Sequence, residues 1–135
     1  MSIDDVKIIN LPKIEDQRGN LSFLESKKHI PFKIRRTYWI YDVPGGYGRG
    51  GHAFLKQHEL IIALSGGFDV ILDDGVRKEK YTLNRSYYGL YVPPTLWREI
   101  NNFSTNSVAM ISSSTFFSED DYVRDYELFL KTKGI

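Results

Sequence analysis

The chain of 135 residues has the usual length of one domain, and 41% hydrophobic with 26% charged residues is an ordinary globular composition. Eighteen Lys and Arg against seventeen Asp and Glu give a formal net charge of +1, which excludes a global field that would attract nucleic acid or an anionic membrane. The absence of cysteine excludes a disulfide framework, a thiolate zinc site and a cysteine nucleophile, and is compatible with the reducing cytoplasm.

The start of the chain is acidic and has no cationic region followed by a long apolar run, so we expect no secretory signal. No stretch approaches the roughly 18 apolar residues that a membrane-spanning helix needs. The sequence also contains no internal repeat, low-complexity segment or linker. We therefore expect a single domain over residues 1–135 and a cytoplasmic location.

Short bursts of β-branched and aromatic residues, separated by turn residues, run through most of the chain, and this pattern is typical of β-strands. Asp74-Gly75 lies between two such bursts and is the strongest hairpin signal. Many short strands predict an antiparallel sandwich or barrel, hence an all-β fold. The predicted strands span residues 6–10, 20–25, 34–43, 51–55, 59–64, 68–72, 78–82, 89–92, 98–101 and 108–113.

The C-terminus has a different, helical rhythm. Apolar residues at Tyr122, Tyr126 and Phe129 recur at helical spacing, and Ser118 before an acidic first turn is a good N-cap. Lys131 and Lys133 carry the charge that suits the other end of a helix. The sequence predicts one terminal helix, beginning at Ser118 and packed on the β-structure.

The densest cluster of glycine and polar residues is the segment 48–54, GRGGHAF. Its glycines let the backbone approach a ligand or another strand closely, although a bulge at a barrel corner would also explain them. In a regular strand His52 and Phe54 share one face. His52 is then either a satisfied core residue or a functional imidazole.

The segment 34–42 is a second candidate for a polar wall. In a regular strand Arg36, Tyr38 and Ile40 share one face. This mixed face resembles the lining of a polar cavity, because burial of an unpaired charge is costly. The alternative is a solvent-facing strand whose aromatic residues shield the sheet.

A third candidate follows Pro93-Pro94, where Trp97 and Arg98 come directly after a tight turn. Arginine offers a fixed fork of donors for phosphate or carboxylate, and tryptophan offers a flat face for a base or a sugar. Alternatively, Arg98 is an edge charge.

A metal site is not indicated. The chain has three histidines, of which His52 and His58 have an even spacing with no third ligand nearby in sequence. Glu59 falls on the opposite parity to His58, so a facial set of two histidines and a glutamate is not expected. We expect neither a metal nor another cofactor.

Several motifs in a fixed order resemble one known family. They are DQRGNL at 16–21, IPFKIRRTY at 30–38, RGGHA at 49–53, VILDDG at 70–75, GLYVPP at 89–94 and DDYVRDY at 120–126. This set resembles the small cupin sugar-nucleotide 3,4-ketoisomerases that act on dTDP-4-keto-6-deoxyglucose, a group called WxcM-like or FdtA/QdtA-like. The resemblance implies a cupin jelly-roll homodimer that exchanges N-terminal strands, needs no metal and binds a dTDP-linked 4-keto-6-deoxy sugar.

The resemblance also implies the chemistry, in which the ketone moves from C4 to C3 through an enediol. His52 matches the first histidine of the family's His-Ala-His segment, and Phe54 stands where the second one, implied as the base, would be. Arg98 stands where a histidine commonly follows the tryptophan. We expect His52 to act as base and Tyr38 as proton relay. The expected substrate contacts are Arg49, Arg36, Arg98, Trp97, Phe54 and His58.

Two other functions remain open at this point. Because of Phe54 and Arg98, the chain could be a catalytically degenerate cupin that binds a dTDP-sugar and regulates or scaffolds a neighbouring enzyme. A 3,5-epimerase would use the same proton chemistry next to a ketone on a related barrel.

Overall fold

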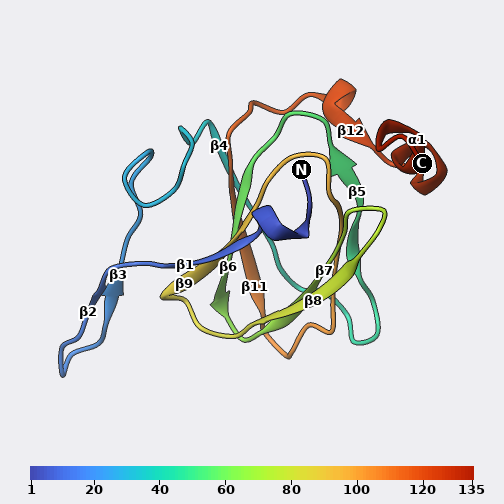
Figure 1. Cartoon of the computed structure of the whole chain (residues 1–135). Coiled ribbons are helices and arrows are strands. Elements are labelled where there is room, and N and C mark those ends of the chain that lie inside the picture. Colours follow the sequence, from blue (N-terminus) through green and yellow to red (C-terminus); the bar gives the residue numbers. More distant parts are fainter.

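The computed structural model describes all residues 1–135 and consists mainly of two antiparallel five-stranded sheets that face each other (Figure 1). In order across the first sheet the strands are β1 (Lys7–Asn10), β9 (Tyr88–Val92), β6 (Glu59–Ser65), β11 (Val108–Ser113) and β4 (Arg36–Ile40). The second sheet has the order β12 (Tyr122–Val123), β5 (Arg49–Phe54), β10 (Trp97–Asn101), β7 (Phe68–Asp73) and β8 (Lys78–Leu83). With one C-terminal helix, this arrangement confirms the predicted all-β cupin-like fold.

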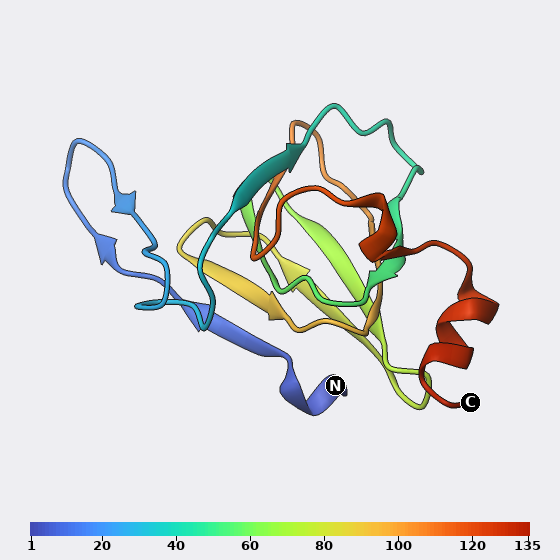
Figure 2. The same ribbon diagram turned by 90° about the horizontal axis from the view of Figure 1, so that it is seen from above.

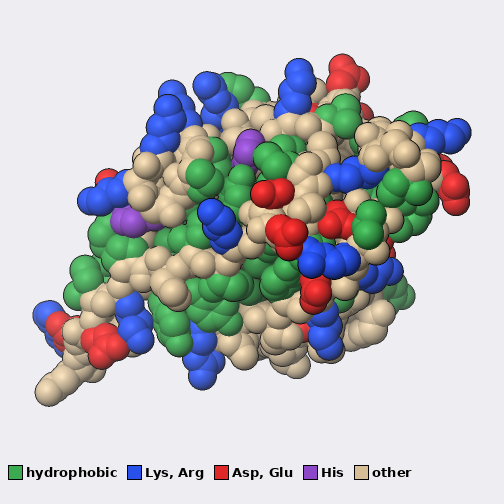
Figure 3. Space-filling model, in the orientation of Figure 1, with side chains coloured by type: hydrophobic (Ala, Val, Ile, Leu, Met, Phe, Trp, Pro, Cys, Tyr) green, Lys and Arg blue, Asp and Glu red, His purple; other side chains and the backbone are tan.

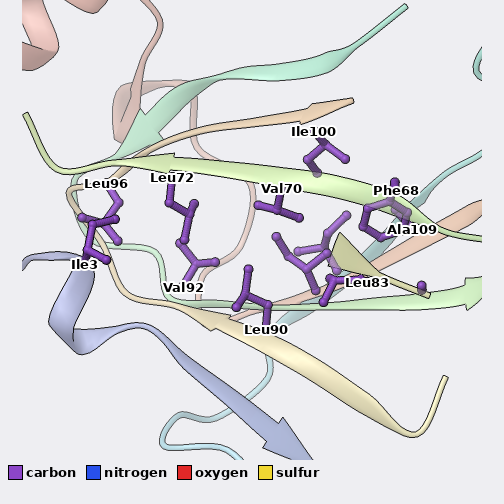
Figure 4. Close-up of a cluster of buried hydrophobic side chains, with 13 residues drawn as sticks. Ile3, Phe68, Val70, Leu72, Leu83, Leu90, Val92, Leu96, Ile100 and Ala109 are labelled. Atoms are coloured by element: carbon purple, nitrogen blue, oxygen red, sulfur yellow. The ribbon is translucent and has the colours of Figure 1, made fainter. Parts of the chain in front are cut away.

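The space between the sheets is filled by inward-facing apolar side chains from both of them. Strand alternation on β6, for example, directs Ile61 and Ala63 inward, whereas Leu60 and Ile62 face outward. The interior cluster, drawn in Figure 4, contains Ile3, Ile61, Ala63, Phe68, Val70, Leu72, Leu83, Leu90, Val92, Leu96, Ile100, Ala109 and Ile111. Burial of these side chains supplies the main favourable term in folding.

A short hairpin projects from the body. Its strands, β2 (Lys13–Ile14) and β3 (Leu21–Ser22), pair only with each other, and Figures 1 and 2 both show this arm extending away from the two sheets. Ile14 and Leu21 are each 55% exposed. The arm therefore has apolar side chains that its own chain does not cover.

Each of the ten predicted strands overlaps a strand of the structure. Asp74-Gly75 turns the chain between β7 and β8 as predicted, and Gly75 has a φ of +91°, which an L side chain would strain. Two short strands, β2 and β12, were not predicted.

The predicted helix is wrong in its first half. Residues Glu119–Asp121 form a 3-10 turn and β12 follows, so Ser118 makes no side-chain cap. The helix α1 spans Tyr126–Thr132, and its N-cap is Asp125, whose carboxylate accepts a hydrogen bond from the backbone N–H of Leu128. The reason is tertiary: β12 pairs with β5, and this pairing satisfies edge backbone groups that a local helix would leave open.

Positive and negative side chains are interspersed on the face drawn in Figure 3, as expected from the near-zero net charge. None of the helices has the length and apolar character needed to cross a membrane.

Candidate active site

A cavity of about 520 Å³ opens between β4 of the first sheet and β5 with β12 of the second. Its size falls within the roughly 300–1,000 Å³ that is usual for small-molecule sites. The residues that line it are Tyr38, Trp39, Ile40, Gly48, Arg49, Gly50, Gly51, His52, Arg98, Tyr122 and Arg124. Because three of these are arginines and none is acidic, the cavity suits an anionic ligand.

The glycines of β5 allow the chain to pass close to Arg98. Gly50 has a φ of +88°, and a Cβ placed on it would lie 2.6 Å from Nη1 of Arg98. The pairing of β5 with β10 is irregular at this point. Beyond the irregularity, alternation directs His52 and Phe54 inward, whereas Ala53 packs in a cluster on the outer face with Trp97 and Phe129.

His52 is buried in the wall of the cavity, and its Nε2 atom has no hydrogen-bond partner. Its ring contacts those of Phe54 and Tyr122, with centroids 4.8 and 4.9 Å away. Burial, together with the positive charges of Arg98 and Arg124, lowers the pKa of His52 to about 3. At neutral pH the imidazole is therefore uncharged and offers one donor and one acceptor nitrogen.

Tyr38, Glu59 and Arg98 form a hydrogen-bonded cluster behind the cavity surface. The phenol of Tyr38 donates to Oε2 of Glu59 at 2.5 Å. Arg98 donates through Nε to Oε1 of Glu59 at 2.6 Å, and through Nη2 to Oε2 of Glu59 at 3.1 Å and to the phenol oxygen of Tyr38 at 2.8 Å. The third nitrogen of the guanidinium, Nη1, has no partner.

Charges in this cluster shift two pKa values. Burial and the charge of Glu59 raise the pKa of Tyr38, despite the opposing charge of Arg98. Burial alone would lower the pKa of Arg98, but Glu59 and Tyr38 outweigh burial and raise it. Arg98 is thus a permanent cation, and Tyr38 keeps its proton at neutral pH.

A second layer of hydrogen bonds holds this cluster. Gln57 donates through Nε2 to Oε2 of Glu59 at 2.9 Å. Its Oε1 accepts from Nη2 of Arg36 and from the hydroxyl of Thr115, each at 2.7 Å. The carboxylate of Glu59 is therefore held from several sides and cannot turn without breaking several bonds.

The structure brings together four of the expected site residues, since His52, Tyr38, Arg49 and Arg98 all line the cavity. Phe54 lies against the ring of His52, with its centroid 5.7 Å from the Arg98 guanidinium, and does not line the cavity. Arg36 lies behind the wall, bonded to Gln57.

Two expected substrate contacts lie outside the cavity because of strand parity. Trp97 faces outward and packs under α1 against Phe129. His58 precedes β6 and also lies outside, where its Nδ1 is 2.7 Å from the hydroxyl of Tyr91. Neither residue lines the cavity.

Sequence reasoning missed Glu59, Gln57, Tyr122 and Arg124. Glu59 could have been found from the alternation of β6, because it shares the inward parity of Ile61 and Ala63. Tyr122 and Arg124 could not have been found in this way, because the sequence pattern predicted a helix for their segment. No group of three or more His, Cys, Asp or Glu side chains lies close enough together to hold a metal ion.

Comparison with known proteins agrees with this geometry. Residues 4–134 match the family described as FdtA: WxcM-like, C-terminal. The chain belongs to this family. It is 43% identical, over 93% of its length and 90% of that protein's, to an enzyme of Aneurinibacillus thermoaerophilus named TDP-4-oxo-6-deoxy-alpha-D-glucose-3,4-oxoisomerase.

Two solved relatives have the same fold over nearly their whole length. The WlaRB TDP-quinovose 3,4-ketoisomerase of Campylobacter jejuni is 41% identical, with a TM-score of 0.91 over 96% of this chain and 99% of that one. The 3,4-ketoisomerase QdtA of Thermoanaerobacterium thermosaccharolyticum is 32% identical, with a TM-score of 0.94 over 96% of this chain and 94% of that one. This chain is therefore a homologue of 3,4-ketoisomerases.

Proposed function

We propose that this protein is a 3,4-ketoisomerase, which moves the ketone of a TDP-4-keto-6-deoxyhexose from C4 to C3. The observation that carries the proposal is the cavity that His52 and Tyr38 share. Arg98 also lines it, lies opposite His52 in the sheet and donates a hydrogen bond to the phenol of Tyr38. QdtA, one of the solved relatives, is crystallised with TDP-4-keto-6-deoxyglucose as a histidine-to-asparagine variant. TDP in these names is the nucleotide called dTDP above.

The reaction requires two proton exchanges. The C4 carbonyl acidifies the C3–H bond, so a base removes that proton and later returns it at C4. A second group moves a proton from the oxygen on C3 to the oxygen on C4. The cavity is lined by three side chains that can carry a proton, His52, Tyr38 and Tyr122, and we assign the two exchanges to His52 and Tyr38, of which Tyr38 is hydrogen-bonded to Arg98 and His52 lies opposite Arg98 in the sheet.

The arginines have separate tasks in this proposal. Arg49 and Arg124 are exposed at the cavity and would bind the diphosphate, for which a guanidinium has the right fork of donors. Arg98 is only 2% exposed and its unpaired Nη1 is buried, so its fixed positive charge would stabilise the negative oxygen of the enediolate from the cavity wall.

The protein would act as a homodimer that exchanges N-terminal strands. The projecting arm and the exposed side chains of Trp39, Tyr41 and Leu64 on the outer side of the first sheet support this proposal. Size-exclusion chromatography with light scattering tests it, and a monomer at micromolar concentration would contradict it. We further propose that the enzyme works in the cytoplasm, in deoxysugar biosynthesis for structures such as the O-antigen of lipopolysaccharide.

Incubation with TDP-4-keto-6-deoxyglucose in deuterated buffer tests the function. A 3-keto product with solvent deuterium at C4 is expected. Deuterium at C3 and C5 with the ketone still at C4 would instead indicate a 3,5-epimerase. A thermal shift with the TDP-sugar but no exchange would indicate a binding module without catalysis.

A further inference from the structure

Two of the three arginines that line the cavity are each held by a carboxylate. Arg98 is bonded to Glu59 in the buried cluster, and Arg124 is bonded to Glu119 at the surface. Arg49, by contrast, forms no ion pair within the chain. The proposed function gives Arg124 a task in binding the diphosphate and leaves Glu119 without one.

The carboxylate of Glu119 holds the guanidinium of Arg124 along one edge. Nε donates to Oε1 at 2.6 Å, and Nη2 donates to Oε2 at 3.0 Å. These hydrogen bonds lower the pKa of Glu119, so its carboxylate is ionised at neutral pH. A guanidinium can also bind an anion along its other edge, between Nη1 and Nη2. That edge of Arg124 remains free for a ligand.

The ring of Tyr122 supports the flat face of the same guanidinium. The central carbon of the Arg124 guanidinium lies 4.2 Å from the centroid of that ring, a distance at which a cation and an aromatic face attract each other. Tyr122 in turn lies against His52, with ring centroids 4.9 Å apart. One edge and one face of the Arg124 side chain are therefore fixed beside the cavity.

The backbone around Glu119 is itself anchored. Glu119–Asp121 form a 3-10 turn directly before β12, and β12 pairs with β5 (Figure 1). The carboxylate of Asp121 accepts hydrogen bonds from the backbone N–H groups of Lys56 at 2.8 Å and Gln57 at 3.2 Å. The turn is thus attached to the segment that follows β5, and Glu119 keeps a fixed place relative to the cavity.

We propose that Glu119 is a positioning residue, which together with Tyr122 holds Arg124 in the orientation that binds the diphosphate of the nucleotide sugar. This inference rests on the proposed function, because it takes the diphosphate as the ligand of Arg124. Glu119 does not line the cavity and acts through Arg124. It contributes to binding and has no part in the proton transfers.

The ion pair has more effect on binding than on folding. The side chains of Arg124 and Glu119 are 55% and 60% exposed, so water screens their attraction and the pair adds little to the stability of the fold. A ligand that binds a free arginine must fix a long side chain with many rotamers. Glu119 fixes Arg124 before the ligand arrives, which lowers the entropy lost on binding. Glu119 need not leave, because a carboxylate and a phosphate can occupy the two edges of one guanidinium.

Titration with TDP by isothermal calorimetry tests this role. Glu119→Ala removes the carboxylate and is expected to weaken TDP binding about three- to tenfold, because Arg124 is no longer preorganised. With TDP-4-keto-6-deoxyglucose, KM should rise by a similar factor while kcat stays within about twofold, since only uniform binding is lost. Glu119→Gln keeps one neutral acceptor oxygen, and its affinity should lie between those of the wild type and Glu119→Ala.

Asp120→Ala is the matched control. Asp120 lies in the same turn, is exposed and forms no ion pair, so this variant makes the same change in net charge and leaves the contacts of Arg124 in place. Its TDP affinity should stay within about twofold of the wild type, because exposed charges are screened by salt. Equal changes in Asp120→Ala and Glu119→Ala would show that only net charge matters, and would overturn the inference.

A double-mutant cycle shows whether Glu119 acts through Arg124. Arg124→Ala should weaken TDP binding by itself, and adding Glu119→Ala to it should change the affinity by less than about twofold. In the background of Arg49→Ala, the effect of Glu119→Ala should persist in full, because Arg49 is not bonded to Glu119. Equal effects of Glu119→Ala in both backgrounds would contradict action through Arg124.

The outcomes distinguish this inference from the proposed function. Tighter TDP binding in Glu119→Ala would mean that the carboxylate competes with the diphosphate, and unchanged binding would mean that it has no effect. Either result, or unchanged TDP affinity in Arg124→Ala, overturns the inference and leaves an active isomerase in place. A wild type that binds TDP without forming the 3-keto product overturns the proposed isomerase alone. A wild type that does not bind TDP overturns both.

Discussion

The apolar interior and the polar cluster lie on the same strands and differ only in position along them. On β6, Glu59 belongs to the cluster and Ile61 to the interior, and on β10, Arg98 belongs to the cluster and Ile100 to the interior. All four side chains are almost fully buried. The interior is held by non-directional packing, whereas the cluster depends on named donors and acceptors. Substitutions in the two regions should therefore affect activity and stability differently.

The largest effect is expected in the chemistry of the polar cluster. His52→Asn should lower formation of the 3-keto product by about 100- to 10,000-fold, because one of the two proton exchanges loses its side chain. TDP affinity should stay within about tenfold, or roughly 1.4 kcal/mol. Steady-state kinetics and calorimetry give both numbers, and equal losses would make His52 a binding or folding residue.

Removal of one partner of the buried ion pair should damage both stability and activity. Arg98→Met leaves the carboxylate of Glu59 buried without its cation, which is expected to cost about 3–5 kcal/mol of unfolding free energy. Denaturant unfolding measures this loss. The double variant Arg98→Met/Glu59→Leu should recover much of the stability and none of the activity. A single variant as stable as the wild type would show that the pair is not coupled.

Truncation of a side chain in the apolar interior should lower stability without changing kcat. Leu83→Ala removes a fully buried side chain on β8 and is expected to cost about 2–5 kcal/mol, because it leaves a cavity. At a temperature where the variant is folded, kcat should match that of the wild type. A large loss of kcat would mean that the geometry of the polar cluster depends on the packing of the interior.

Gly50 tests how closely the backbone approaches the cluster. Gly50→Ala should cost about 1–2 kcal/mol, because an L side chain is strained at positive φ, and its Cβ would displace Nη1 of Arg98 and lower kcat. Gly45→Ala is the matched control, since Gly45 has no positive φ and no atom within 4 Å of the added Cβ. Similar results for the two variants would contradict the close approach.

The remaining effect is a pH dependence of stability. The pKa of His52 is lowered from 6.5 to about 3, so between these pH values the unfolded chain binds a proton that the folded chain does not. Stability should therefore fall as the pH drops below 6.5, and His52→Asn should reduce that fall. Thermal melting of both proteins between pH 7 and pH 4 would measure it, and parallel curves would contradict the shift.

The sequence predicted the fold well where the signal was local. Strand alternation correctly placed His52 and Phe54 on one face of their strand, and Asp74-Gly75 gave the correct hairpin. The prediction failed where backbone pairing between segments far apart in the sequence decides the secondary structure. Tyr122 and Val123 have helical spacing relative to Tyr126, but their backbone pairs with β5, a partner far away in the sequence.

The candidate site was predicted only in part. His58 and Trp97 were selected as substrate contacts because of their residue types, but strand alternation places their side chains outside the cavity. Glu59 had the right parity, but a single carboxylate in an apolar strand gives no sign of its partners until the strands meet.

The strand β12 is formed close to the end of the chain, yet it brings Tyr122 and Arg124 to the cavity wall. A ribosome must therefore synthesise the chain through Arg124 before the binding site is complete. A product of premature termination before this strand would lack part of that wall, so partially synthesised chains should neither capture the nucleotide sugar fully nor compete for it.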